Sequence, residues 1–504
     1  MLSDTLQSVR ARIAGRPLFY LLLIALAVRM LSVIWSRGYG WHDDHFLIIE
    51  AAQSWVDGYD YNRWLPQNSG TPSGHSFFYV GIHFLLLKGM VAIGMDNPLL
   101  RMFWIRLLHA LLSLLVVYYG YRILEKFSNK EVALQGGILL ALYWFMPFLS
   151  VRNLVEVVCI VPLMAGTWML LRSEKTRLLD YAFAGFLFGL AFSVRFQTAL
   201  FFAGASLALL MYKKWRPLFV FGMAYLLCVL LVQGGIDMFV WGRPFAEFGE
   251  YVRYNLENAG NYGGMPWYNY IFLLLGMLLP PVGFFFAFGF FRSFRKHLLL
   301  TLPATIFLLF HFYFQNRQER FILPAVPFLI IAGLIGWQSF RGSSLFWSKN
   351  VRLYKFCISF FWVLNLILLV PISFHYTKKD KVEAMTYLRE KGDAKAYILE
   401  DSNRDFRMLM PDYYWGRWGH FHDIINDTDL NAFIPYLQQL PLADRPNYIL
   451  FLQDENIEER VAKMKSWYPS LRYETTIRPS FIDDLLHRIN RHNRNQTVYI
   501  YKID

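Results

Sequence analysis

Long apolar runs alternate with short polar segments over the first three quarters of the chain. A membrane-spanning helix needs about 20 mostly apolar residues, and eleven runs approach or reach that length. The pattern therefore predicts an all-α polytopic membrane protein with about eleven transmembrane helices. These runs lie near residues 17–35, 103–121, 132–150, 155–171, 178–194, 196–212, 217–236, 269–291, 298–315, 321–338 and 354–374.

A twelfth run, at 77–95, is ambiguous because it is long enough to cross but contains His83 and Lys88. Basic residues collect in the cytoplasmic loops of membrane proteins. If this run lies along the interface as an amphipathic helix, every basic cluster between spans falls on the side of the N-terminus, which carries three arginines before the first span. If it crosses, all of these clusters face outward. We therefore predict an interfacial helix at 77–95, and a retained first span rather than a signal peptide.

This topology places the first loop (36–102), a long loop (237–268) and the end of the chain on the outer face. From residue 377 the composition becomes that of a soluble domain, with helical stretches alternating with β-rich runs, which predicts a small α/β domain. We expect a transmembrane catalytic domain at 1–376 and an outer-face domain, periplasmic or luminal, at 377–504. The expected helices are Val382–Lys391, Ile457–Trp467 and Phe481–Asn490, and the expected strands are Ala396–Leu399, Tyr448–Leu452 and Val498–Tyr501.

Composition supports the membrane class. The 504 residues are 56% hydrophobic and only 17% charged, whereas a soluble domain has about 25% charged residues. The formal net charge of +13 would suggest nucleic-acid binding in a soluble protein, but here the basic residues follow the inside loops, so we expect no nucleic-acid partner. Cys159, Cys228 and Cys357 fall in apolar runs and indicate neither a disulfide framework nor a cysteine metal site.

Two adjacent acids, Asp43 and Asp44, follow the first apolar run and stand between His42 and His45, with Glu50 a little further along. Carboxylates close to hydrocarbon are costly, so they are retained either paired or in use. One interpretation is that an acid of this pair caps the following helix. The other is a general base that takes a proton from a sugar hydroxyl. The position of the pair in the first outer loop favours the base. His42, His45 and Glu50 of the same loop are candidates for substrate contact.

Further charged residues stand at the outer ends of later spans, where basic clusters are otherwise scarce. Arg152 and Glu156, four residues apart, form either a mutual ion pair or a site for an anionic substrate. Arg195 lies in a tight turn between two runs, a position that favours contact of its side chain with lipid headgroups. The alternative is that Arg195 contacts substrate. Arg317 and Arg320 break the positive-inside pattern, which indicates a bound anion, a lipid phosphate or pairing with a neighbouring acid.

The long outer loop interleaves aromatic residues with Asn, Asp and Gly. This composition suits carbohydrate, because sugar faces stack on aromatic rings while hydroxyls bind amides and acids. Aromatic residues are also expected at any membrane interface. The candidates for substrate contact in this loop are Asp237, Tyr254, Asn255, Tyr262 and Trp267.

Three motifs occur in a characteristic order. The first loop has His42-Asp43-Asp44-His45, then Glu50 and Gly58. The long loop has Asp237, Trp241-Gly242, Tyr254-Asn255, Tyr262-Gly263 and Pro266-Trp267. A late segment reads Asn316-Arg317-Gln318-Glu319-Arg320-Phe321, followed by Pro324 and Pro327.

Over about residues 17–340 these motifs resemble those of the dolichyl-phosphate-mannose-dependent α-mannosyltransferases of the GT-C superfamily, which build N-glycan precursors and GPI anchors and have bacterial relatives. The family's first loop carries His-Pro-Asp-Glu, and its late motif is His-Lys-Glu-x-Arg-Phe. His45 thus replaces the family's Glu, and Asn316-Arg317-Gln318 replaces His-Lys-Glu. Aligning the histidines puts Asp44 on the family's proposed catalytic base, with Asp43 as the rival position.

The resemblance implies a GT-C fold with interfacial helices in the first outer loop and an active site at the outer surface. It implies an inverting glycosyltransferase that moves a hexose, with mannose expected, from a polyprenyl-phosphate donor to a hydroxyl of a glycan or glycolipid acceptor. Arg152, Arg317 or Arg320 would stabilise the phosphate leaving group. No metal and no other cofactor is expected.

Two other classes stay open. A transporter or flippase of lipid-linked sugars should place ionisable groups and broken helices at the membrane midplane, whereas the charges here gather at the outer rim, which favours the enzyme. A non-catalytic binder of lipid-linked glycans is the third alternative. The expected location is a bacterial inner membrane with the site facing the periplasm, and the alternative is the endoplasmic reticulum membrane with a lumen-facing site.

Overall fold

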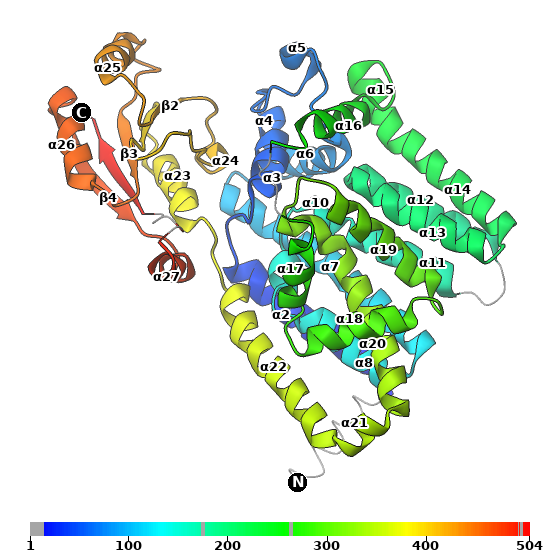
Figure 1. Cartoon of the computed structure of the whole chain (residues 1–504). Helices are drawn as coiled ribbons and strands as arrows, with labels where there is room; N and C mark the ends of the chain where they lie inside the picture. Colours follow the sequence, from blue (N-terminus) through cyan, green and yellow to red (C-terminus); the bar gives the residue numbers. More distant parts are fainter. Residues whose placement is uncertain (1–14, 173–176, 262–265, 492, 494–496, 504) are drawn as a thin grey trace. The chain divides into compact units, whose positions relative to one another are not determined.

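The computed structural model of the chain (Figure 1) describes residues 15–172, 177–261, 266–491, 493 and 497–503. It divides into two compact units. The helical unit comprises Met1–Ile34, Arg63–Ile82 and Phe103–Phe374, and the mixed unit comprises Trp35–Asn62, His83–Met102 and His375–Asp504. The segment that carries Asp44 therefore belongs to the same unit as the C-terminal sheet, and the division into catalytic and outer-face domains at residue 376 stays a prediction.

Helices form at all eleven predicted spans. Among the described residues, six helices are long and apolar enough to cross a membrane, or seven if one bent pair counts as a single span. These are Pro17–Trp35 (α2), Pro98–Phe127 (α7), Val155–Arg172 (α10 and α11), Trp215–Trp241 (α14 and α15), Glu319–Ser343 (ending in α20), Val351–Ser373 (α22), and the pair Asn269–Met277 (α17) with Val282–Ser293 (α18). Shorter apolar helices are Phe77–Ala92 (α6), Leu178–Val194 (α12), Phe196–Met211 (ending in α13) and Leu298–Tyr313 (α19).

The remaining helices before residue 374 are short or lie between the long ones. They are His42–His45 (α3), Ala51–Val56 (α4), Pro66–Ser69 (α5), Lys130–Leu142 (α8), Met146–Leu149 (α9), Ala246–Asn258 (α16) and Leu345–Lys349 (α21).

The core of the helical unit surrounds α20 (Val326–Ser343), in which every residue from Val326 to Trp337 is buried. A helix that is apolar all round belongs inside a bundle. On one side α18 packs against it so closely that a Cβ atom on Gly289 would lie 1.9 Å from the carbonyl oxygen of Gly333. Small residues permit this approach of two backbones, as is usual between membrane helices.

Two of the predicted spans are broken, and their breaks meet. The run 132–150 leaves the helix after Leu142, and the run 269–291 bends by 114° between α17 and α18, where Pro280 and Pro281 interrupt the helical hydrogen bonds. Tyr143 Oη donates to the carbonyl oxygen of Leu278 at 2.6 Å. The buried amide of Asn365 in α22 donates to the carbonyl oxygen of Leu142 at 2.8 Å and accepts the N–H of Trp144 at 3.0 Å. Backbone groups freed within an apolar bundle are thus satisfied by side chains.

The C-terminal part of the mixed unit contains the predicted α/β structure, drawn from yellow to red in Figure 1. Its five-stranded sheet has the order β2-β1-β3-β5-β4, in which β1 pairs in parallel with β2 and β3 while β5 is antiparallel to β3 and β4. The strands are Tyr397–Glu400 (β1), Phe421–Ile424 (β2), Tyr448–Leu452 (β3), Arg472–Ile477 (β4) and Val498–Lys502 (β5). The helices are Lys379–Lys391 (α23), Asp412–Trp415 (α24), Leu430–Gln439 (α25), Ile457–Trp467 (α26) and Phe481–Ile489 (α27).

All six elements expected in this region are present, with small shifts at their ends. The sequence analysis missed α24, α25, β2 and β4. The last of these has no residue buried along its length, so it lacks the apolar run that identifies an inner strand. The sheet and α25 and α26 enclose one apolar core that includes Ile398, Ile434 and Met464.

Candidate active site

The first candidate region is the acidic segment, residues 41–50 of the mixed unit. It is helical, with α3 followed by a π-helical turn at Phe46–Glu50 and then by α4. Single π turns inside helices are rare and are frequent at functional sites. The segment starts with a capping contact, because Asp44 Oδ1 accepts the N–H of Trp41 at 3.0 Å and Oδ2 accepts the N–H of Gly40 at 2.8 Å. The backbone thus fixes the orientation of the Asp44 carboxylate.

The two acids of the segment differ in accessibility. Asp44 is 2% exposed, while Asp43 is half-buried. His42 is exposed and its ring stacks on Phe46 with a centroid distance of 4.8 Å. Asp44 is therefore the preorganised carboxylate, and Asp43 is the one that solvent reaches.

His45 and Glu50, both predicted to contact substrate, lie inside the mixed unit. Glu50 Oε1 lies 2.9 Å from His45 Nε2, and both side chains are fully buried. Burial lowers the pKa of His45 to about 3 and raises the pKa of Glu50 well above its usual value. His45 is therefore neutral at physiological pH, and these two residues bind one another rather than facing a cavity.

The second candidate region is the arginine cluster of the helical unit, formed by Arg152, Glu156, Arg195 and Arg320. Glu156 pairs with Arg195 and lies 3.6 Å from Arg320 Nε, two contacts that the sequence analysis did not consider. Arg152 lies over the ring of Phe148 at 4.3 Å. All four charged side chains are buried. Arg195 therefore does not extend to lipid headgroups, contrary to the favoured interpretation of its sequence position.

The arginine cluster carries an excess of positive charge, because the guanidinium groups of Arg195 and Arg320 share one carboxylate, that of Glu156. In addition, Nε and Nη2 of Arg195 are buried and donate to no atom of the described residues. Buried polar groups are normally hydrogen-bonded, and guanidinium groups match the oxygens of phosphate. The cluster therefore has the charge and the donors to bind an anion.

Arg317 does not belong to this cluster. Its guanidinium donates to the carbonyl oxygen of Phe312 at 2.9 Å and to that of Tyr313 at 3.3 Å. These carbonyls are at the end of α19, where cations interact favourably with the helix dipole. The structure therefore gives different partners to the two arginines that the sequence analysis had grouped, since Arg320 Nε lies 3.6 Å from Glu156 Oε1 while Arg317 contacts the end of α19.

The long outer loop forms the end of α15 (Gly235–Trp241) and α16 (Ala246–Asn258). Asp237 is buried and accepts the amide of Gln233 at 2.9 Å and the N–H of Glu247 at 3.1 Å. It thus fixes the start of α16 by capping rather than by facing substrate. One turn further along α16, the ring of Tyr251 lies 5.2 Å from that of Phe196, which is next to Arg195 in sequence. The loop therefore lies next to the arginine cluster.

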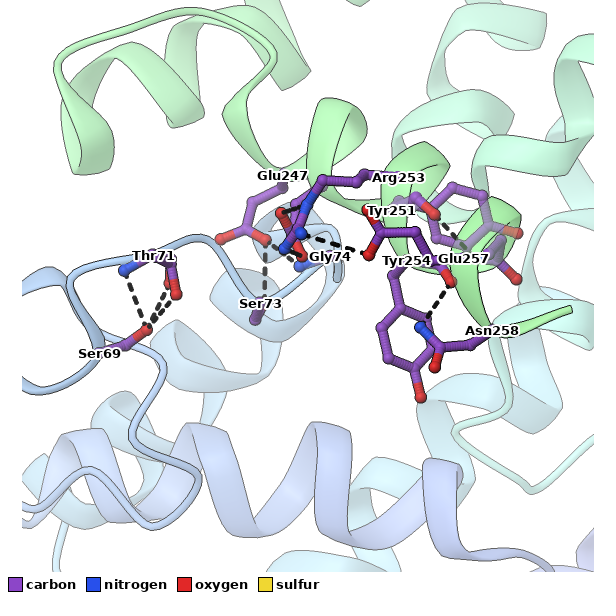
Figure 2. Close-up of polar contacts among 12 residues, drawn as sticks. Ser69, Thr71, Ser73, Gly74, Glu247, Tyr251, Arg253, Tyr254, Glu257 and Asn258 are labelled. Carbon is purple, nitrogen blue, oxygen red and sulfur yellow. Dashed lines mark hydrogen bonds and ion pairs between the residues drawn. The ribbon is translucent and has the colours of Figure 1, made fainter. Parts of the chain in front are cut away.

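Sequence reasoning missed Glu247, which Figure 2 shows directed toward Ser73 and Gly74. Its Oε2 accepts Ser73 Oγ at 2.9 Å and the N–H groups of Gly74 and His75 at 2.6 and 3.2 Å, and its Oε1 accepts Trp241 Nε1 at 2.8 Å. Burial raises the pKa of Glu247 to about 7. No spacing in the sequence indicated the contact with Ser73, Gly74 and His75, because these residues lie more than 170 positions before Glu247.

The other predicted residues of this loop have simpler surroundings. Tyr254 is 46% exposed and lies on α16 near Asn258, whose amide donates to its carbonyl oxygen (Figure 2). The Asn255 amide donates to the carbonyl oxygen of Tyr251 at 2.8 Å, and Trp267 is 59% exposed. Tyr262 lies outside the described residues.

Within the described residues, no group of three or more His, Cys, Asp or Glu side chains has an arrangement that could hold a metal ion.

Comparison with known proteins identifies the family of the chain. The sequence model of the Alg9-like mannosyltransferase family matches residues 20–422. GPI mannosyltransferase 3 of Drosophila melanogaster is 24% identical, over 80% of this chain and 70% of that protein. GPI alpha-1,2-mannosyltransferase 3 of Homo sapiens is 25% identical, over 75% and 68%.

The fold has a solved counterpart. The crystal structure of ArnT from Cupriavidus metallidurans bound to undecaprenyl phosphate matches with a TM-score of 0.60, covering 96% of this chain and 97% of ArnT at 11% sequence identity. The predicted GT-C fold is confirmed by this likeness.

Proposed function

The chain belongs to the Alg9-like mannosyltransferase family and is a multi-pass membrane glycosyltransferase, and from this premise we propose that it transfers mannose from a polyprenyl-phosphate donor to a hydroxyl of a glycan or glycolipid acceptor. The relatives above carry the name mannosyltransferase, which supports the sugar. ArnT, which shares the fold, holds undecaprenyl phosphate in its crystal structure, which supports the class of donor.

The observation that carries the proposal is the arginine cluster. When the sugar leaves its donor, the lipid phosphate takes up negative charge. Arg195 and Arg320 contact Glu156 and supply fixed positive charge, and Arg152 is a further buried arginine four residues before Glu156. Nε and Nη2 of Arg195 have no partner among the described residues. Preorganised donors of this kind stabilise developing charge strongly in a site that excludes water.

Asp44 is the proposed base. Its carboxylate is fixed by two backbone N–H groups, and it would take the proton of the acceptor hydroxyl as that oxygen attacks the anomeric carbon and displaces the phosphate with inversion. Asp43, the more accessible acid, is the second candidate for this role. The site would face the outer side of the membrane, the periplasm in a bacterial inner membrane or the lumen of the endoplasmic reticulum.

The experiment compares purified wild type with Asp44→Asn and Asp43→Asn, using polyprenyl-phosphate mannose and lipid extract as acceptor source. Loss of a general base lowers the rate by roughly 100- to 10,000-fold, and we expect this loss in Asp44→Asn. The matched control is Asp96→Asn, because Asp96 is an exposed acid of the same predicted outer loop, and its transfer rate should equal that of wild type.

Each outcome has a definite meaning. If Asp43→Asn loses transfer while Asp44→Asn retains it, the base is Asp43. If wild type transfers sugar from no polyprenyl-phosphate donor, the donor proposal fails, and a protein that only binds lipid-linked glycans becomes the better description.

A further inference from the structure

The contact between the C-terminal part of the chain and the acidic segment lies entirely within the mixed unit. It is made by α24, the short helix Asp412–Trp415. Both oxygens of Glu50 accept the backbone N–H of Tyr413, at 3.1 and 3.0 Å, and Tyr413 Oη donates to the carbonyl oxygen of Pro98 at 3.2 Å. An element 363 residues later in the chain thus contacts the helical segment that carries Asp44.

A second contact fixes the residue next to Asp44. The ring of His45 lies between the rings of Tyr39 and Tyr414, with centroid distances of 4.6 and 5.5 Å and interplanar angles of 16° and 7°. His45 Nε2 lies 2.9 Å from Glu50 Oε1. With both faces and one nitrogen of the ring in contact, the side chain that follows Asp44 has one orientation.

The helix α24 is itself attached to the sheet. Asp412 accepts the hydroxyl of Tyr397, in the central part of the sheet on β1, at 3.1 Å. A continuous series of contacts therefore leads from β1 through Asp412, Tyr413, Glu50 and His45 to the residue beside Asp44. Each member of the series is buried.

The segment before Asp44 is attached to the same part of the chain. Ser36 Oγ donates to the carbonyl oxygen of His375 at 3.1 Å, and Thr377 Oγ1 donates to that of Arg37 at 3.3 Å. Gly38 has φ +73°, and a Cβ atom there would lie 1.8 Å from the carbonyl oxygen of Thr377. Only glycine fits this approach, so the backbone that leads into the acidic segment follows residues 375–377.

We propose that α24 and Glu50 are positioning elements for Asp44, so that the C-terminal α/β region is a required part of the transferase rather than an appended domain. The inference rests on the proposed function only where the test measures the rate of sugar transfer. Glu50 would act through its hydrogen bonds and not by touching substrate, unlike the substrate contact that its place in the first loop suggested.

The contacts of Glu50 predict which substitution at this position the protein tolerates. Among the described residues no lysine or arginine pairs with Glu50 or with Asp412, and burial raises the pKa of both carboxyl groups well above their usual values. A neutral group in place of Glu50 is therefore sufficient. Glutamine has the same shape and an oxygen that accepts the N–H of Tyr413, whereas alanine removes the contact.

The test uses the full-length protein with four variants, Glu50→Ala, Glu50→Gln, Tyr414→Ala and, as a control, Tyr436→Ala on the exposed face of α25. Small displacements of a reacting group can lower the rate by about 100-fold. We expect kcat to fall by about 10- to 100-fold in Glu50→Ala and Tyr414→Ala, with KM for the donor unchanged. Glu50→Gln and Tyr436→Ala should keep the wild-type kcat.

A second readout is independent of activity. Hydrogen–deuterium exchange of the peptide covering residues 36–50 should become faster in Glu50→Ala and in Tyr414→Ala, while peptides from α20 stay protected. Faster exchange in all peptides of Glu50→Ala would indicate global unfolding of that variant. The exchange of residues 36–50 in Tyr414→Ala would then test the proposal.

Two results would overturn the proposal. Equal loss of kcat in Glu50→Gln and Glu50→Ala would mean that the charge of Glu50 acts directly on substrate. Wild-type exchange over residues 36–50 in Tyr414→Ala would mean that α24 does not position the segment. If wild type shows no transfer from any donor, the proposed function fails, yet the exchange measurement still decides the role of α24.

Discussion

The protein treats buried charge in two opposite ways. Glu50 in the mixed unit and Glu247 in the helical unit are buried carboxyl groups that accept backbone N–H groups, and neither pairs with a lysine or arginine of the described residues. In the arginine cluster the basic groups outnumber the acids, because Arg195 and Arg320 share the single carboxylate of Glu156 and leave net positive charge.

The buried carboxyl groups and the arginine cluster are suited to two different roles. A carboxyl group that accepts backbone N–H groups of a distant segment fixes the position of that segment. Because burial favours the neutral form and raises the pKa of the carboxyl group, its protonation depends on pH. A guanidinium group stays charged at any pH that a protein meets. The carboxyl sites are therefore suited to positioning loops, whereas the cluster is suited to stabilising a phosphate.

The largest effect is expected from Glu156→Ala. Removing one partner of a buried ion pair typically costs about 3–5 kcal/mol, because it leaves a buried charge uncompensated. Here two arginines lose their shared carboxylate, so thermal unfolding in detergent should occur well below the wild-type temperature. The exposed Glu131→Ala, near the start of α8, is the control. Unfolding of Glu156→Ala at the wild-type temperature would show that the cluster needs no internal counter-charge.

Arg320→Gln tests the same cluster by activity. Loss of one donor that stabilises transition-state charge lowers kcat by about 100- to 1,000-fold, and we expect a loss of this size at saturating donor. Arg320→Lys keeps the charge but not the planar guanidinium, so it should recover part of the rate. Wild-type kcat in Arg320→Gln would remove Arg320 from the phosphate site.

The carboxyl sites should respond to pH, which the arginine cluster should not. The pKa of Glu247 is raised from 4.5 to about 7, so the folded state binds its proton more tightly than the unfolded state. The stabilisation is fully present below pH 4.5 and is lost as the pH rises through about 7, a change of about 3 kcal/mol. Melting curves of wild type should therefore show falling stability over this window.

Glu247→Gln separates this residue from other titrating groups. Because glutamine does not ionise, the variant should lose less stability than wild type between pH 5 and pH 8, whatever its stability at pH 5. Parallel pH curves for the two proteins would contradict the assignment of the effect to Glu247.

The smallest effect is expected from Arg317→Gln. Arg317 donates to carbonyl oxygens at the end of α19, an interaction worth about 0.3–1 kcal/mol. The melting temperature should fall slightly while kcat stays at the wild-type value, in contrast to Arg320→Gln. A large loss of kcat would place Arg317 with the phosphate-binding residues after all.

Much of the fold followed from local pattern. The apolar runs predicted all eleven helical regions, and helical stretches and β-rich runs predicted six elements of the C-terminal α/β region. Where prediction of the helices failed, as at Leu142 and at Pro280-Pro281, the breaks depend on side chains such as Asn365 and Tyr143 that satisfy the freed backbone. These partners come from other helices and cannot be read from the run itself.

The sequence by itself determined which segments are apolar enough to form membrane helices, and it indicated which polar residues are chemically unusual there, among them Asp44, Arg195 and Arg320. Only the tertiary structure decided their partners. Glu156 pairs with Arg195 and Arg320, and Glu50 contacts Tyr413. The physical reason is that burial of apolar residues follows from short-range periodicity, whereas the partner of a buried charge is selected by packing between segments that can be hundreds of residues apart.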